Sequence, residues 1–203
     1  MKLARIEISN FRLLKNFVLD LEDELSLLIG KNNTGKTSVL SCLDKLVVQS
    51  ERNAVSYEDF NIELRSSLEK ILRGDQEIGA KEQYVPFGIQ LKLFIKYSES
   101  DDLSKISPLI MSLDPDDDNV VLSFEYKISF DKLDELKLRY TEESNKFDNR
   151  PHLFLKEKLA DYFGPIVKKS LLHDDENKFL DLHKERINLK DILAIQFINA
   201  KRS

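Results

Sequence analysis

The sequence contains one cysteine, no tryptophan, six glycines and five prolines among 203 residues. The single cysteine, Cys42, excludes a framework of internal disulfides, and its apolar neighbours predict a small buried side chain rather than a reactive thiol. Basic and acidic residues nearly balance, 31 against 36, which argues against a strongly basic nucleic-acid module but leaves room for a local basic patch. The sequence also lacks a membrane-length apolar run and the apolar core of a signal peptide. We therefore expect a cytoplasmic protein with no membrane partner.

Two of the few glycines, Gly30 and Gly35, belong to a phosphate-binding motif. Residues 30–37, GKNNTGKT, fit the P-loop pattern G-x-x-x-x-G-K-[ST]. The glycines let the backbone turn tightly and bring its N–H groups close to phosphate oxygens. Lys36 adds a full positive charge for the β- and γ-phosphates, and the Thr37 hydroxyl can ligate Mg²⁺. The motif predicts a nucleotide site that holds Mg²⁺.

The segments on either side of the motif have the order that the mechanism requires. Residues 25–29 form a short apolar run, which predicts a buried strand. After the loop, apolar residues recur at helical spacing up to Val47. Before the loop, residues 1–10 and 17–21 alternate apolar and polar side chains, which predicts two strands paired as a hairpin.

The N-terminal stretch resembles ABC-type ATPases of the RecF and structural-maintenance-of-chromosomes kind. The similarity lies in a strand ending in Ile-Ser-Asn-Phe-Arg at residues 8–12, then an alternating strand, then a P-loop of the form G-x-N-x-x-G-K-[ST] in which Asn32 supplies the asparagine. Within this group the chain is most similar to the OLD (overcoming lysogenization defect) family of ATP-dependent endonuclease-like proteins, which has relatives in anti-phage defence. The resemblance covers residues 1–48, and a weaker one, including Ser-Tyr-Glu-Asp-Phe at residues 56–60, extends to about residue 62.

The resemblance implies a fold and a set of site residues. The expected fold is an α/β P-loop NTPase of the ABC-ATPase kind, with a mixed sheet and antiparallel strands at the N-terminus. The expected nucleotide contacts are Gly30, Asn32, Asn33, Gly35, Lys36, Thr37 and Ser38. Lys36 is the expected catalytic residue, because it would stabilise charge on the transferring phosphoryl group. Arg12 matches the family's Phe-Arg position near the nucleotide; the alternative is a solvated arginine in a turn.

The resemblance also implies a biological activity. Two such domains would form a homodimer that sandwiches Mg²⁺ and ATP, and ATP hydrolysis would drive or regulate DNA cleavage by a Toprim domain. Two alternatives stay open: a RecF-like DNA-repair or tethering ATPase without a nuclease, and a nucleotide sensor that gates a nuclease elsewhere. The chain alone is expected to bind nucleotide and to hydrolyse it poorly.

The sequence departs from the family pattern in two respects. It contains no Gly-Gly pair, so a signature of the Leu-Ser-Gly-Gly type is missing. The nearest candidate for a Walker B strand, residues 120–125 ending in Glu125, fits a half-exposed antiparallel strand better. The chain stops just after an apolar run at residues 192–198. We therefore expect residues 1–203 to be the N-terminal part of one ATPase domain, with a P-loop core at 1–50 and further strands and helices at 51–203.

The remaining chain is read from hydrophobic periodicity. We expect helices at residues 62–73, 101–113, 131–143 and 151–163, the second kinked or shortened by Pro108, and strands at 87–97, 120–130 and 178–184. Asp114, Asp116, Asp118 and Glu125 have the spacing of an EF-hand loop, but a strand follows where a helix is required, so a solvated acidic turn is favoured. His152, His173 and His183 lie far apart, with no metal-ligand spacing.

Overall fold

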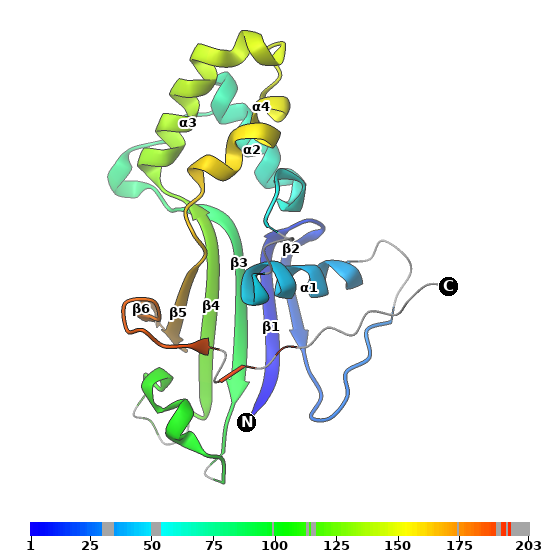
Figure 1. Ribbon diagram of the computed structural model, residues 1–203, viewed down its shortest axis with the longest axis vertical. Coiled ribbons are helices and arrows are strands. Elements are labelled where there is room, and N and C mark those ends of the chain that lie inside the picture. Colours follow the sequence, from blue (N-terminus) through cyan, green and yellow to red (C-terminus); the bar gives the residue numbers. More distant parts are fainter. Residues whose placement is uncertain are drawn as a thin grey trace.

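The fold is built on an antiparallel sheet, seen in a computed structural model that describes residues 1–29, 35–49, 54–98, 100–112, 114, 117–173, 175–189, 192, 193 and 195 (Figure 1). Within these residues, six strands form one sheet in the order β2-β1-β3-β4-β5-β6. The strands are β1 (Lys2–Phe11), β2 (Leu14–Asp20), β3 (Phe87–Lys96), β4 (Asn119–Ile128), β5 (Val167–Leu172) and β6 (Asp175–Asp181). Every neighbouring pair is antiparallel.

The predicted N-terminal hairpin is confirmed. In β1, Ile6 and Ile8 are buried while Arg5 and Glu7 point to the other face, as the alternation of the sequence requires. β2 pairs with β1 in a register that sets Ile8 opposite Phe17. The other edge of β1 pairs with β3, which follows in the chain only after the P-loop region and the first helices. The hairpin therefore forms one edge of the sheet, with β2 as the outermost strand.

Helix α1 (Lys36–Leu43) lies across one face of the sheet, over the hairpin strands (Figure 1). It continues into a five-residue π-helical turn, Asp44–Val48. The side chains of Val39, Cys42 and Leu46 turn toward the sheet and are buried in the core. The predicted helix after the P-loop is thus confirmed, although one of its apolar residues, Leu40, is exposed.

Three further helices form a lobe beyond one end of the sheet (Figure 1). They are α2 (Ile62–Arg73), α3 (Phe130–Glu143) and α4 (Pro151–Tyr162), and they pack on one another. The Asn61 side chain caps α2 by accepting a hydrogen bond from the N–H of Glu63, and Gly74 ends the helix in a left-handed conformation. These helices match the predicted segments within one residue at each end.

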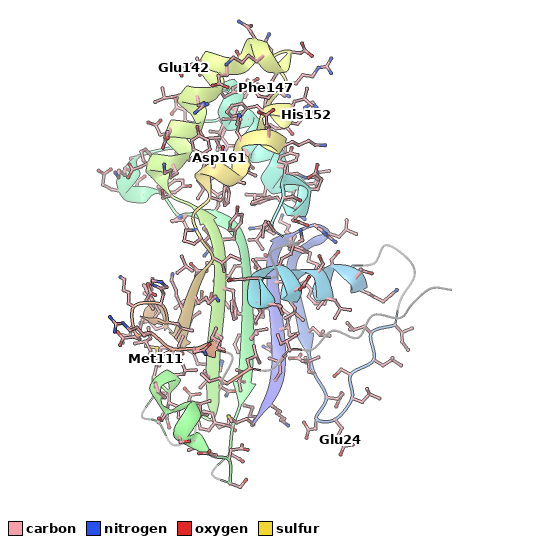
Figure 2. All side chains as sticks on the ribbon, in the orientation of Figure 1. Glu24, Met111, Glu142, Phe147, His152 and Asp161 are labelled. Atoms are coloured by element: carbon pink, nitrogen blue, oxygen red, sulfur yellow. The ribbon has the colours of Figure 1, made fainter. Side chains whose placement is uncertain are left out.

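Two features of the predicted fold are wrong. The sheet is antiparallel throughout the described residues, not mixed. Residues 25–29, which we predicted to form a buried strand, have no strand structure, and Leu25 and Ile29 are 78% and 84% exposed. Figure 2 shows Glu24 at the bend where the chain turns away from the sheet before this run. An apolar run becomes a strand only where neighbouring strands satisfy its backbone groups, and no described segment pairs with it.

Three shorter segments also differ from the predictions. In place of a helix over residues 101–113, the structure has two 3₁₀ turns, Leu103–Lys105 and Ser107–Leu109. Pro108 accounts for the difference, because proline lacks the N–H that a continuous helix needs. β5 was not predicted, and β6 begins three residues before the predicted strand. Among the described residues, we find no helix with the length and apolar character needed to span a bilayer.

Candidate functional site

The second half of the P-loop motif forms the start of α1. Gly35 is the N-cap residue, and Lys36, Thr37 and Ser38 make up the first turn of the helix. The carbonyl oxygen of Gly35 accepts hydrogen bonds from the N–H groups of Ser38 and Val39, at 2.9 and 3.2 Å. The other predicted contacts, Gly30, Asn32 and Asn33, lie outside the described residues. The described half therefore has the loop-to-helix order that the motif predicts.

Gly35 has a conformation and a setting that favour glycine. Its φ of 93° lies in the left-handed region, where a side chain is strained. A Cβ atom on Gly35 would also come within 2.9 Å of Cδ2 of Leu14, a buried residue of β2. The β1–β2 hairpin therefore lies against the last glycine of the P-loop.

The first turn of α1 has a positive character. The N-terminal end of a helix carries a partial positive charge, and this turn contains no acidic residue that would offset it. Lys36 adds a full charge at the first helical position, while Thr37 is exposed and Ser38 is buried. An anionic ligand with a bound cation, such as Mg·ATP, fits this donor set.

Arg12 is held in place by an acidic residue from a distant part of the sequence. Its Nε and Nη2 atoms both lie 2.9 Å from Oδ1 of Asp59, and its guanidinium lies 5.1 Å from the ring centroid of Phe11. The side chain of Arg12 is 36% exposed, whereas that of Asp59 is 1% exposed. Arg12 thus lies in the turn between β1 and β2, partly exposed and paired with a buried carboxylate.

Lys45 completes this charged cluster from the other side. Its Nζ lies 2.5 Å from Oδ2 of Asp59, and the side chains of both residues are buried. The N–H of Ser56 also donates to Oδ2, at 2.9 Å. Burial raises the pKa of Asp59, but the hydrogen bonds from Lys45, Ser56 and Arg12 outweigh it, so that the pKa lies below its ordinary value. Asp59 is an anion shared by two cations.

The roles of Asp59 and Lys45 were not predicted. Asp59 belongs to the segment at residues 56–60 that carries the weaker family resemblance, but nothing in its sequence neighbourhood indicates a partner more than 40 residues away. Lys45 gave a better signal, because it lies at helical spacing from Cys42 on the apolar face of the helix. A charged residue in such a place requires a buried counter-ion.

The cysteine is a core residue, as predicted. Cys42 has no exposed surface, and it lies on the side of α1 that packs on the sheet. Burial raises the pKa of its thiol, and the nearby charge of Asp59 adds to this effect. The thiol is therefore protonated at neutral pH, as expected for a side chain in the core.

The structure argues against Glu125 as a Walker B residue. β4 runs antiparallel to both of its neighbours, and Glu125 alternates with the buried core residue Phe124, so it faces away from α1. Its carboxylate accepts a hydrogen bond from Lys169 at 3.0 Å and lies 3.5 Å from Nζ of Lys127. Burial raises the pKa of Glu125, but the effect of these two lysines is larger. The pKa of Glu125 therefore lies below its ordinary value. Glu125 is part of an ion-pair network on the opposite face of the sheet.

Neither of the other two groups of potential ligands forms a metal site in the described part of the chain. In the acidic segment, Asp118 pairs with Lys96 at 3.0 Å, and β4 begins at the next residue; Asp116 lies outside the described residues. The histidines belong to different regions: His152 lies in the helical lobe (Figure 2), whereas His173 packs against Phe94 of the sheet.

The comparisons with known proteins agree with the geometry of the P-loop helix. Residues 1–200 match the family described as AAA ATPase domain. This family is part of the RecF/SMC-like group of ABC-type ATPases. A search of the curated proteins finds no match.

Proposed function

Because the chain belongs to the AAA ATPase domain family, we propose that it binds Mg·ATP at residues 30–38 and contributes this half-site to ATP hydrolysis. The observation that carries the proposal is the start of α1. A complete G-x-x-x-x-G-K-T motif leads into a helix whose N-cap glycine is left-handed and whose first turn carries no acidic side chain. Such a turn attracts phosphate groups, and it contains no negative side chain that would repel them.

Each residue of the motif has a distinct task in this proposal. The backbone N–H groups of the glycine loop and the first turn of α1 would hold the α- and β-phosphates. Lys36 would balance negative charge on the β- and γ-phosphates and on the phosphoryl group during transfer. Thr37 would supply a hydroxyl ligand to Mg²⁺, which neutralises phosphate oxygens when it is bound. Ser38, the next residue of the turn, would be a further contact to the nucleotide.

Hydrolysis is proposed for a dimer of this domain. The ABC-type family implies that the P-loop of one protomer meets a signature motif from the other, and no Gly-Gly signature occurs in this sequence. Lys36 and the helix turn would position and stabilise the phosphates, and they would do little of the remaining chemistry.

At a finer level, we propose that ATP binding regulates DNA cleavage, as in OLD-like endonucleases. The support is the resemblance of residues 1–48 and of the Ser-Tyr-Glu-Asp-Phe segment. The test is cleavage of plasmid DNA by the protein that carries this domain, with ATP and with a non-hydrolysable analogue. Cleavage that responds to the nucleotide supports the proposal. DNA binding without cleavage would favour a RecF-like tether instead.

The nucleotide site itself is tested by calorimetric titration of the chain with Mg·ATP. We compare the parent chain with Lys36→Ala and with Lys70→Ala, a matched loss of one lysine on the exposed surface of α2. Removing the P-loop lysine is expected to weaken binding by at least tenfold, since a charged contact to phosphate is lost. The α2 variant is expected to bind like the parent. Equal affinities for all three proteins would overturn the proposal.

A further inference from the structure

Asp59 occupies a position that the P-loop motif does not explain. It is a buried carboxylate, 1% exposed, that lies between two cations from different elements. Arg12 reaches it from the turn between β1 and β2, and Lys45 reaches it from the π-helical turn after α1. A buried carboxylate is tolerated only where such partners compensate for the lost hydration. The arrangement therefore fixes the positions of all three side chains relative to one another.

The backbone around Arg12 is clamped by the same segment. The N–H of Arg12 donates to the carbonyl oxygen of Asp59 at 2.7 Å, and the Nδ2 of Asn61 donates to the carbonyl oxygen of Arg12 at 2.7 Å. The N–H of Asn61 donates in turn to the carbonyl oxygen of Asn10. Arg12 has a φ of 49°, a left-handed conformation that non-glycine residues adopt only when their surroundings hold them. Residues 59–61 supply those surroundings.

This clamped turn adjoins the P-loop. Leu14, two residues after Arg12, lies against Gly35, the N-cap residue of α1. Lys45 belongs to the continuation of the same helix. Asp59 is thus connected to the beginning of the P-loop helix through the hairpin, and to its end through an ion pair. At the same time the side chain of Arg12 keeps about a third of its surface exposed, so Asp59 does not bury it completely.

We propose that Asp59 is a positioning residue that holds the Arg12 guanidinium beside the P-loop, where it stabilises the terminal phosphate charge of bound ATP. The inference rests on the proposed nucleotide site. Asp59 itself does not touch the substrate; it acts by fixing the rotamer and the backbone of Arg12. A preorganised arginine loses less conformational freedom when it binds a phosphate than a free one does.

The test removes Asp59 without leaving an unpaired buried cation. Asp59→Asn alone would leave Lys45 buried beside a neutral group, so the main variant is Lys45→Met/Asp59→Asn. Lys45→Met is its matched control, because it keeps the pair between Arg12 and Asp59. Arg12→Gln, and Arg12→Gln combined with the main variant, complete a double-mutant cycle. Circular dichroism and thermal unfolding identify the variants that are folded, and affinities for Mg·ATP and Mg·ADP are measured by calorimetry.

If Asp59 acts through Arg12, three results are expected. Lys45→Met/Asp59→Asn and Arg12→Gln each weaken Mg·ATP binding by about tenfold, as for loss of one charge-assisted contact. The protein that combines these substitutions binds Mg·ATP no more weakly than Arg12→Gln alone. The affinity for Mg·ADP changes by less than about threefold in Lys45→Met/Asp59→Asn and in Arg12→Gln, because ADP lacks the terminal phosphate. Lys45→Met binds Mg·ATP and Mg·ADP with affinities within about twofold of the parent.

A purely structural role for Asp59 predicts different numbers. In that case, loss of Asp59 would weaken both nucleotides equally, and by the same factor whether or not Arg12 is present; either result overturns the inference. Unchanged Mg·ATP binding in the folded Lys45→Met/Asp59→Asn variant also overturns it, while a loss of binding in Lys36→Ala still supports the nucleotide site. If the parent chain binds no Mg·ATP, the proposed function and this inference fall together.

Discussion

The Cδ2 atom of Leu14 lies 2.9 Å from the point where a Cβ atom would stand on Gly35. This contact joins the β1–β2 hairpin to the P-loop helix, two elements that the sequence separates by the whole P-loop. It also gives the second glycine of the motif a packing role in addition to its left-handed φ of 93°. A side chain at position 35 would therefore have to adopt a left-handed backbone conformation and also displace the Leu14 side chain.

Gly35→Ala is expected to lower the free energy of unfolding by about 2–3 kcal/mol, from backbone strain and from the contact with Leu14. Gly79→Ala is the matched control, because Gly79 has a similar φ of 83° and nothing within 4 Å of its Cβ position. That control should lose only the strain, about 1 kcal/mol. Urea unfolding of both variants measures the difference. Equal losses would show that Leu14 moves aside without cost.

The buried Asp59 predicts a specific loss of stability in acid. Its pKa in the folded chain lies below the ordinary value because the hydrogen bonds from Lys45, Ser56 and Arg12 outweigh burial. The unfolded chain therefore takes up the proton first, at a pH near 4. The stabilisation is fully present above that pH, and it is lost as the pH falls through the folded pKa. Lys45→Met/Asp59→Asn lacks this contribution.

The measurement is a series of urea unfolding curves between pH 7 and pH 3 for the parent chain and for this variant. The stability of the parent should fall faster with acid, so that the gap between the two proteins narrows below about pH 4. Asp23→Asn is the control for an exposed ion pair, because Asp23 bonds to the side chain of Lys2 at the surface, where solvent screens the interaction. A gap that stays constant with pH would show that folding does not shift the pKa of Asp59.

Local sequence patterns determine most of this fold. β1 and β3 bury alternate apolar residues, Ile6 and Ile8 in the first and Ile89, Leu91 and Leu93 in the second, whereas β4 is buried continuously from Val120 to Phe124. Helices α2 and α4 were predicted within one residue, because a glycine or proline marks an end of each. In these elements periodicity, capping and burial all agree, so no tertiary information is needed.

The errors occur where the outcome depends on distant residues. Residues 25–29 have the composition of a buried strand, but composition does not supply the neighbouring strands that such a run requires. β5 was missed because two consecutive lysines, Lys168 and Lys169, interrupt its apolar pattern. In the fold, Lys169 donates a hydrogen bond to Glu125 of the neighbouring strand β4. Likewise, the P-loop could be read from its motif, whereas the pairing of Arg12 with Asp59 depends on the tertiary fold.

Cys42 is expected to resist thiol reagents in the folded chain. It has no exposed surface, and burial raises the pKa of its thiol, so little thiolate is present at pH 8. Reaction with an aromatic disulfide reagent should follow the rate of unfolding and become fast in urea. A control protein, Cys42→Ala/Leu40→Cys, moves the thiol to the exposed face of the same helix and should react at once. Rapid reaction of native Cys42 would show that α1 separates readily from the sheet.

Glu125→Gln distinguishes an ion-pair residue from a Walker B residue. The Glu125 carboxylate accepts a hydrogen bond from Lys169 and lies on the face of the sheet opposite α1, so its loss is expected to cost about 1–2 kcal/mol of stability. A Walker B acid helps to hold Mg²⁺, and its removal would reduce the gain in ATP affinity that Mg²⁺ provides. We expect this gain, measured by calorimetry with and without Mg²⁺, to be the same in Glu125→Gln and the parent. Thr37→Ala, which removes the proposed Mg²⁺ ligand, should reduce the gain in ATP affinity that Mg²⁺ provides. A similar reduction in Glu125→Gln would show that Glu125 takes part in Mg²⁺ binding at the nucleotide site.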